Sequence, residues 1–495
     1  MSISFAHVPS GIRVPLFYAE VDASAANLGA NNLKALLIGQ KTQEGVAEAN
    51  KPVLVTSSAA GQQLFGRGSQ LALMNSAYRN NDGFGEVWAI PVTEPEGVKA
   101  SGTLTVTGSS ALGGAVSVYV SGKCTRVAIA PSANATAIAS AISTGINANL
   151  DLPVTASAVS TVVTLTAKNV GTSGNDIRIA VNSRGFAAGE VLPEGVAIAV
   201  STFGGGSGDV GLQEVVKAMG DEEFDFIAMP YCDTISLDIF KQEMDDTAGR
   251  WSPLRQVYGH VYTAKRDSVA NLSDFGRARN DQHCSVIGVE PAIESLACEV
   301  LAAAVARCAM SGSVDPARPL QTLELVGIAP AQVGSRFTLT EKQALLTSGI
   351  ATLYTEGGYV RIERMITSYQ KNAFGDADVS YLDSETLHTL AFIVRDLRRI
   401  VTSKYARHKL ASDGTVYGPG QTVVTPSVIR GEIVAEYERL EERALVENTK
   451  LFKQHLIVER DVQDPNRVNV LLPPDLVNQL RVFAVLAQFR LQYQE

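Results

Sequence analysis

FDFIAMPY, residues 224–231, is the first of three apolar runs that decide the fold of this chain. The other two are RQVYGHVYTA at 255–264 and CSVIGVEP at 284–291, and segments with a helical pattern lie between and around the three. Apolar strands that alternate with helices are typical of a mostly parallel sheet that helices cover on both faces. The sequence therefore predicts an α/β fold with a doubly wound core.

The same alternation begins earlier in the chain. LKALLIG at 33–39, PVLVTS at 52–57 and EVWAIPV at 86–92 are predicted to be strands, and a single helix is predicted over 61–81. Short apolar runs bounded by turn residues are typical of buried strands. These segments form the predicted first part of the core, residues 31–98.

After residue 98 the composition changes. Between residues 101 and 167 only three side chains are charged, and Thr, Ser, Val and Ala dominate. We interpret residues 99–204 as an inserted β-rich domain, because runs of this composition favour short strands. The core is expected to resume over 205–345. The glycine-rich FGGGSGDVG at 203–211 is expected to be a flexible connection between the two.

One helix is predicted within the insert. Pro131 and Ser132 mark its start, and Ile138, Ile142 and Ile146 recur every four residues on one face. We expect this helix to pack on a small sheet.

The last third, residues 346–470, is predicted to be a C-terminal α/β domain. It opens with a hairpin, GIATLYTEGGYVRIERMI at 349–366, that turns at the glycine pair 357–358. Two amphipathic helices follow, one from Ser384 and one from Thr425, which a proline follows. Their apolar faces are predicted to consist of Leu387, Leu390, Val394, Leu397 and Val401, and of Ile429, Ile433, Tyr437, Leu440 and Leu445.

Both ends of the sequence carry segments with the alternation of a β-strand. We expect residues 1–30 and 471–495 to be extended arms whose strand partners are not adjacent in the sequence. Two prolines in the first arm exclude a helix and confine such a strand to the edge of a sheet. The apolar side chains expected to pack in these arms are Ile12, Val14, Leu16, Tyr18, Val485, Phe489, Leu491 and Tyr493.

Charge and hydropathy limit the classes of partner. With a formal net charge of -9 and a pI near 5.4, the chain is not expected to bind nucleic acid directly. The most apolar helical stretch, 296–310, contains Glu299 and Arg307 and is shorter than the roughly 20 residues that span a bilayer, so no direct membrane insertion is expected. The first residues lack the features of a secretory signal, and the five scattered cysteines are expected to be reduced.

Three carboxylates follow the predicted core strands: Asp233, Asp267 and Glu290. Ligands of doubly wound folds bind at this end of the sheet, so these residues leave open a metal-dependent hydrolase. The sequence favours helix capping instead, because Asp233 and Asp267 each precede a predicted helix closely. The sequence contains no phosphate-binding loop, no G-x-S-x-G motif and no metal-type histidine spacing, so we expect no cofactor and no enzymatic activity.

The densest positive segment is RDLRRIVTSKYARHK at 395–409, and the next helical segment, 431–447, is strongly acidic. Two interpretations stay open. The two helices have solvated faces with intrahelical ion pairs, or they present complementary surfaces that dock a partner. The candidate docking residues are Arg395, Arg398, Arg399 and Lys404.

An extended arm, an α/β core with a β-rich insert, and a second arm follow one another in this chain. In this order the segments resemble the contractile tail sheath proteins of bacteriophages, most closely those of Mu-like phages. The resemblance covers essentially the whole chain and rests on the order and spacing of segments, not on a catalytic motif. The segments that carry it are FAHVPSGIRVPLFYAEVD (5–22), GTSGNDIRI (171–179), TSGIATLYTEGGYVRIERMITSY (347–369) and ERDVQDPNRVNVLLPPDLVNQLRVFAVLAQFRLQYQE (459–495).

The resemblance implies a structural protein that polymerises as stacked hexameric rings around a tail tube and contracts to drive the tube through the host envelope. Its implied partners are further copies of the chain, the tail tube protein, and the baseplate and tail terminator proteins. The implied location is the virion tail, after assembly in the host cytoplasm. In that family the two arms add strands to small sheets of neighbouring subunits, and the basic segment would then face the tube or a neighbour. A static virion component, such as the tube protein itself, is a further alternative.

Overall fold

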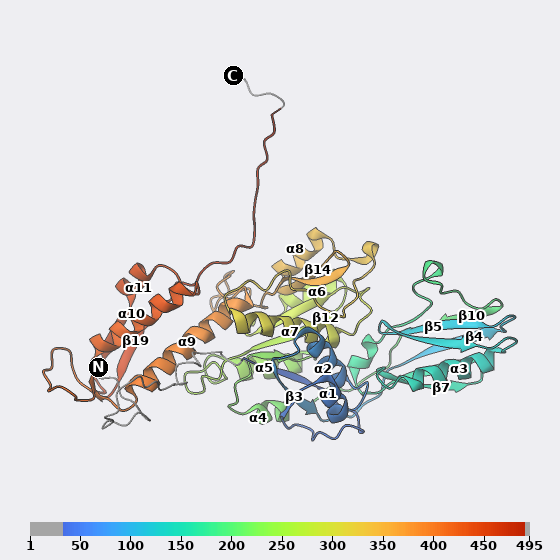
Figure 1. Cartoon of the computed structure of the whole chain (residues 1–495), viewed down its shortest axis with the longest axis horizontal. Coiled ribbons are helices and arrows are strands. Elements are labelled where there is room, and N and C mark those ends of the chain that lie inside the picture. The colour runs from blue at the N-terminus through green and yellow to red at the C-terminus, as the bar shows by residue number, and fades with distance from the viewer. Residues whose placement is uncertain (1–32, 491–495) are drawn as a thin grey trace, which may run out of the picture. The chain divides into compact units, whose positions relative to one another are not determined.

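The computed structural model describes residues 33–490. Its largest sheet has eight strands in the order β15-β14-β13-β12-β11-β1-β3-β2. Strands β3, β12 and β14 of this sheet are labelled in Figure 1. The six central strands are parallel, and β15 and β2 pair antiparallel at the two edges. These strands are β1 (Lys34–Gln40), β2 (Val53–Leu54), β3 (Glu86–Val92), β11 (Phe226–Ala228), β12 (His260–Arg266), β13 (Cys284–Val289), β14 (Ile350–Glu356) and β15 (Tyr359–Arg364). The predicted mixed α/β fold is confirmed.

The central strands are apolar on both faces. Leu36 and Leu37 are neighbours in β1 and both are fully buried, yet they pack into different hydrophobic clusters. Successive side chains of a strand point to opposite faces, so the two clusters lie on the two faces of the sheet. The cluster around Leu37 includes side chains of α1 (Ser58–Phe65), α2 (Gln70–Asn81) and α7 (Ala297–Val314). The cluster around Leu36 includes side chains of α4 (Gln213–Met219), α5 (Thr234–Met244), α6 (Val269–Arg277) and α8 (Leu339–Thr347).

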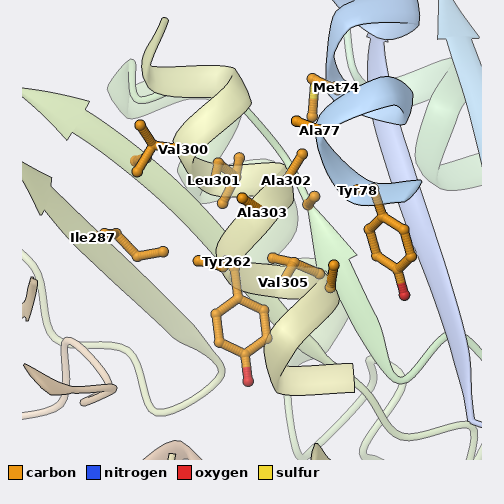
Figure 2. Packing of buried hydrophobic residues seen from close by; sticks show 14 of the residues in the cluster. Met74, Ala77, Tyr78, Tyr262, Ile287, Val300, Leu301, Ala302, Ala303 and Val305 are labelled. Carbon is orange, nitrogen blue, oxygen red and sulfur yellow. The ribbon is translucent and has the colours of Figure 1, made fainter. Parts of the chain in front are cut away.

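Helix α7 is buried over most of its surface. Figure 2 shows it between α2 and the sheet, with Ala302 on the side of Met74 and Ala77, and with Tyr262 and Ile287 on the strands. Within residues 33–490 it is the one helix long and apolar enough to cross a membrane, and 67% of it is buried inside the fold. Its run of alanines lets α2 and the strands approach closely, so α7 serves as the central helix of the core.

The single helix predicted over 61–81 is wrong, because the structure has two helices there. The break lies at Gly66 and Gly68, whose φ angles are +82° and +77°. Only glycine adopts such angles without strain, so the glycines end α1. Ser57 and Ser69 each cap the helix that follows through a side-chain oxygen.

The chain between β3 and α4 forms two smaller sheets and one helix. The four-stranded sheet has the order β10-β4-β8-β7, and the three-stranded sheet has the order β6-β5-β9. Ile138, Ile142 and Ile146 are buried as predicted, but the helix begins at Ala135 after the capping residue Asn134. The elements are β4 (Ser101–Gly108), β5 (Gly114–Val120), β6 (Lys123–Ile129), α3 (Ala135–Ala148), β7 (Val154–Val159), β8 (Val162–Ala167), η1 (Thr172–Asp176), β9 (Ile179–Val181), η2 (Phe186–Ala188) and β10 (Val196–Val200).

The last part of the described chain contains the predicted hairpin and both predicted helices. Strands β14 and β15 pair antiparallel, and Gly357 and Gly358 at the turn have φ angles of +59° and +86°. The later elements are α9 (Ser384–Tyr405), β16 (Lys409–Leu410), β17 (Val423–Val424), α10 (Pro426–Glu442), α11 (Thr449–His455), β18 (Ile457–Arg460) and β19 (Val468–Leu471), with the short η3 (Val333–Ser335) before α8.

Four members of the apolar face predicted for α10 are confirmed, since Ile429, Ile433, Tyr437 and Leu440 are buried on the helix. Leu445 is buried too, but it follows the end of the helix at Glu442. The face predicted for α9 is partly wrong. Val394 is exposed, whereas Phe392 and Ile393 are buried in one cluster with side chains of α10 and α11, and Ile400 is also buried. Leu387 is buried as predicted. Helix α9 thus contacts two different groups of residues along its length, and a single heptad-like stripe does not describe it.

The ends of the chain are described only in part. The predicted arm residues Ile12, Val14, Leu16, Tyr18, Leu491 and Tyr493 lie outside the described residues. Up to residue 490 the chain after β19 forms no further strand, so the strand predicted from Gln488 is not formed within this chain over the part that the structure describes.

Candidate functional site

The three carboxylates at the carboxyl ends of the core strands have structural partners. Asp233 caps α5, since its Oδ1 accepts a hydrogen bond from the backbone N–H of Ser236 at 2.8 Å. The capping predicted for Asp267 is carried by its neighbour: Ser268 caps α6, and Asp267 accepts from the backbone N–H of Ser268 at 2.8 Å. Over residues 33–490 no group of three or more His, Cys, Asp or Glu side chains is placed to hold a metal ion.

Glu290 is the third of these carboxylates, and burial raises its pKa above the ordinary value. Its Oε1 accepts a hydrogen bond from the backbone N–H of Phe337 at 3.0 Å, so it holds the segment that leads into α8. The three carboxylates therefore stabilise the ends of separate elements.

A cavity of about 380 Å³ lies at the same edge of the sheet, between the strand ends and the chain around η1. Tyr231 donates a hydrogen bond to Gln70 Oε1 at 2.9 Å, and the Cys232 thiol is hydrogen-bonded to Thr263 and Ala264. Burial raises the pKa of the Cys232 thiol, which keeps it protonated and poorly nucleophilic. Gln70 also donates its backbone N–H to Asn169 Oδ1 of the insert at 2.9 Å, so the polar groups of this cavity bond to one another and to the insert.

The basic segment of α9 is largely paired inside the subunit. Arg395 donates to Asp225 on the core and lies 3.2 Å from Glu223 (Nε to Oε2), and its guanidinium lies over the Tyr258 ring, 5.5 Å from the centroid. Its side chain is only 15% exposed. Arg395 therefore fastens α9 to the core, and its charge is not free for a partner.

The other candidate docking residues are more exposed. Arg399 pairs with Asp396 one turn before it, at 2.5 Å, and Lys404 pairs with Glu432 of α10. Arg398 is exposed and its side chain makes no ion pair with another residue of 33–490. Both intrahelical and interhelical pairs occur, and docking through Arg398, Arg399 and Lys404 stays a prediction.

Strands β18 and β19 form a separate, two-stranded antiparallel sheet with Ile457 opposite Leu471. Val458 and Val468 pack against the cluster that α10 and α11 form. Ile457 and Leu471 are 51% and 59% exposed. Each strand has a second edge that no described residue pairs, and an isolated pair of strands is marginally stable on its own.

The chain after β19 first stays attached to the subunit and then leaves it. The backbone N–H of Glu447 donates to Asp475 at 2.8 Å, and Gln479 donates to the carbonyl of Ala317 at 2.9 Å. Beyond Arg481 a series of large apolar side chains is between 71% and 86% exposed. These residues are Val482, Phe483, Val485, Leu486 and Phe489.

We call residues 482–490 the exposed arm. Val485 and Phe489 are predicted arm residues, and the structure shows both exposed. Phe483 lies on the same face of an extended chain but was not predicted, and Val482 and Leu486 lie on the other face. The continuous apolar run VFAVLA at 482–487 was a usable signal for all three. Contiguous exposed apolar residues of this kind mark interaction sites in soluble proteins.

Comparison with known proteins agrees with this geometry. Residues 205–368 match the family model described as phage tail sheath protein central domain, and residues 376–490 match the phage tail sheath C-terminal domain. The chain is 38% identical over 496 residues to the Mu-like prophage FluMu tail sheath protein of Haemophilus influenzae, an alignment that covers 99% of this chain and 100% of that protein.

Solved structures share the fold at low sequence identity. The crystal structure of a sheath tail protein from Desulfitobacterium hafniense superposes with a TM-score of 0.50 at 14% identity, over 95% of this chain and 97% of that one. A chain of the anti-feeding prophage baseplate has a TM-score of 0.50 at 11% identity, over 97% and 100% of the two chains. With the full-length relative and the two family models, these findings show that the chain belongs to the phage tail sheath protein family.

Proposed function

We propose that this protein is the subunit of a contractile sheath in the tail of a Mu-like phage. Its copies polymerise as stacked hexameric rings around the tail tube and shorten to drive the tube through the host envelope. Its partners are then other copies of itself, the tail tube protein, and the baseplate and tail terminator proteins, and assembly takes place in the host cytoplasm. The full-length similarity to a tail sheath protein supports this proposal.

The proposal that copies polymerise rests on one observation: the chain carries both an arm that can add a strand and a sheet edge that can receive one. The exposed arm, 482–490, carries large apolar side chains that residues 33–490 leave between 71% and 86% exposed. The β18–β19 sheet has two strands, and no strand of residues 33–490 pairs with its outer edges. Addition of an extended segment to such an edge supplies main-chain hydrogen bonds and buries alternate side chains. A donor and an acceptor at different places give a heterologous contact, which repeats from copy to copy.

We assign the parts of the chain as follows. Residues 31–98 and 205–345 form a doubly wound core, 99–204 an inserted domain and 346–470 the C-terminal domain, with arms at 1–30 and 471–495. Contraction is then a rigid-body rearrangement of subunits that stay linked through their arms. The energy is stored at assembly and released as subunits bury more surface against each other, so no nucleotide is required.

Removal of the exposed arm tests this proposal. A chain that ends at Arg481 should fold and melt as the full chain does, because the large apolar side chains of 482–490 are 71% to 86% exposed and bury little surface against the described residues. It should fail to form long tubes in electron micrographs. Tubes of normal length from the truncated protein would refute arm exchange. A polymer that forms but never shortens on release from the baseplate would instead favour a static virion component.

A further inference from the structure

We infer that Arg481 roots the C-terminal arm on the α/β core and thereby sets the point at which the arm leaves the subunit. The inference rests on the proposed function, in which residues 482–490 bind a neighbouring copy. Arg481 Nη2 donates to Glu385 Oε1 at 2.8 Å and to Asp383 Oδ1 at 3.2 Å. Its Nη1 donates to Gln321 Oε1 at 3.1 Å.

The charges around Arg481 alternate along a connected row. Asp383 also accepts two hydrogen bonds from Arg364, both at 2.9 Å, and Glu385 also accepts from the backbone N–H of Leu320 at 2.6 Å. The side chain of Arg481 is 12% exposed and that of Glu385 is 1% exposed. We call Arg364, Asp383, Arg481 and Glu385 the arm-root network. A buried carboxylate such as Glu385 is costly without its cationic partner, so the network fixes the position of Arg481 strongly.

The arm-root network belongs to the core side of the subunit. Arg364 is the last residue of β15, and Asp383 and Glu385 stand at the start of α9. One turn further along α9, His388 bonds to Tyr262 of the central strand β12 at 2.8 Å. The root of the arm is therefore tied to the eight-stranded sheet through α9.

The contacts change abruptly at Arg481. Up to that residue the chain is held by hydrogen bonds to the loop after α7, and directly after it Val482 and Phe483 are 79% and 83% exposed. The donor arm thus leaves from the start of α9, whereas β18 and β19, the proposed acceptor, rest on α10 and α11. Force that a neighbouring subunit exerts on the arm is then transmitted to the eight-stranded sheet. The β18–β19 sheet does not bear this force and stays available to bind the arm of another subunit.

The test compares Arg481→Met in the full chain and in the chain that ends at residue 481. Arg318→Met is the control, since it removes a charge from the adjoining exposed loop without entering the network. The double variant Arg481→Met with Glu385→Met removes Arg481 together with its buried partner and leaves the Arg364–Asp383 pair in place, so no buried carboxylate loses its only cation and the variant is expected to fold even where the single variant does not. Circular dichroism measures melting of the unassembled proteins. Sedimentation measures the protein concentration needed for half-assembly.

We expect the concentration for half-assembly of the full chain to rise about tenfold in Arg481→Met and in the double variant, and not in the control. In the truncated chain the same substitutions should leave any remaining self-association unchanged, because the arm that Arg481 positions is absent. Equal losses in both backgrounds would show a general structural role and overturn the inference. Normal assembly of the full-length variants, when truncation alone blocks assembly, would overturn the inference and leave the proposed function standing. Normal assembly of the truncated chain would overturn both.

Discussion

His388 of α9 and Tyr262 of β12 share a hydrogen bond, Nε2 to Oη at 2.8 Å, which joins the C-terminal helices to the central sheet. The His388 ring also stacks on Phe226 with 4.4 Å between centroids. Both rings belong to a buried set that includes His260, which is bonded to Ser285 Oγ at 2.8 Å. An apolar environment favours the neutral form of the His388 imidazole over the charged form, so the contact depends on pH.

Acid should weaken this contact. Burial lowers the pKa of His388 to about 4 from its ordinary 6.5, with Asp225 opposing and Arg395 adding to the shift. In the unfolded chain the imidazole takes a proton near pH 6.5, so stability is fully present above pH 6.5 and is lost as pH falls towards 4. The loss is on the order of 3 kcal/mol over this window.

Thermal melts of unassembled protein between pH 4 and 7 measure the effect. His388→Gln keeps a polar group that can bond to Tyr262 and should make the decline in melting temperature shallower. The decline should not vanish, because burial also lowers the pKa of His260 strongly. An unchanged slope in the variant would contradict this assignment.

Arg395 should matter more for folding than for docking. Its partner Asp225 is 5% exposed and would lose its cation in Arg395→Met, although it still accepts from the backbone N–H of Lys34 at 2.9 Å. We expect a loss of about 3 kcal/mol in the free energy of unfolding. Arg398→Met on the exposed side of the same helix should change it by less than about 0.5 kcal/mol. Denaturant titration of the two variants compares them, and similar values would contradict the burial argument.

The elements that could be predicted from the sequence are those that depend on a pattern of only a few neighbouring residues. β3 was predicted with its observed bounds, and the glycine pair at 357–358 marked its hairpin, because strand burial and turn chemistry act over a few residues. The prediction was wrong where contacts with distant residues determine which side chains are buried. Val394 fits the stripe of α9, yet Phe392 is buried in its place because α9 also packs on the residues around α10.

The candidate site was predictable only in part. Exposed apolar residues at the C-terminal end follow from the sequence pattern, but ion pairs between distant segments do not. The pairing of Arg395 with Asp225 joins residues 170 positions apart, and Arg481 reaches Glu385 across 96 positions. No spacing rule connects such positions, so the sequence could not show that Arg395 of the basic run is already paired within the subunit.

Gly66 offers a test of the break between α1 and α2. Its φ is +82°, and a Cβ there would come within 2.0 Å of Thr42 Oγ1. Gly66→Ala should therefore destabilise the protein by roughly 1 to 3 kcal/mol. Gly431→Ala is the matched control, because Gly431 lies inside α10 with open space around it and the change should stabilise by about 1 kcal/mol. Loss of stability in both variants would argue against the conformational explanation.

The insert should be removable at a measurable cost. Val98 and Ser207 form an antiparallel bridge, so a short Gly/Ser linker can join the two ends after residues 99–206 are deleted. The remaining chain should unfold cooperatively at a lower temperature, because Arg266 loses Asp176, its ion-pair partner at 2.8 Å. Adding Arg266→Met to the deletion should recover part of the loss. A deletion variant without a cooperative transition would show that the core needs the insert to fold.

The basic segment of α9 can be tested on the assembled protein. Arg398→Glu with Arg399→Glu reverses two exposed charges. It also removes the cationic partner of Asp396, whose side chain is 12% exposed, so a melt of the unassembled variant is compared with that of the unchanged protein. If these residues dock the tail tube, polymer that forms on purified tubes should fall while polymer that forms without tubes persists, and the loss should be larger at low salt than at high salt. Lys217→Glu on α4 is the control, since it breaks an exposed pair of the same spacing with Glu214. Equal loss of both polymers in the double variant would assign the segment to contacts between sheath subunits.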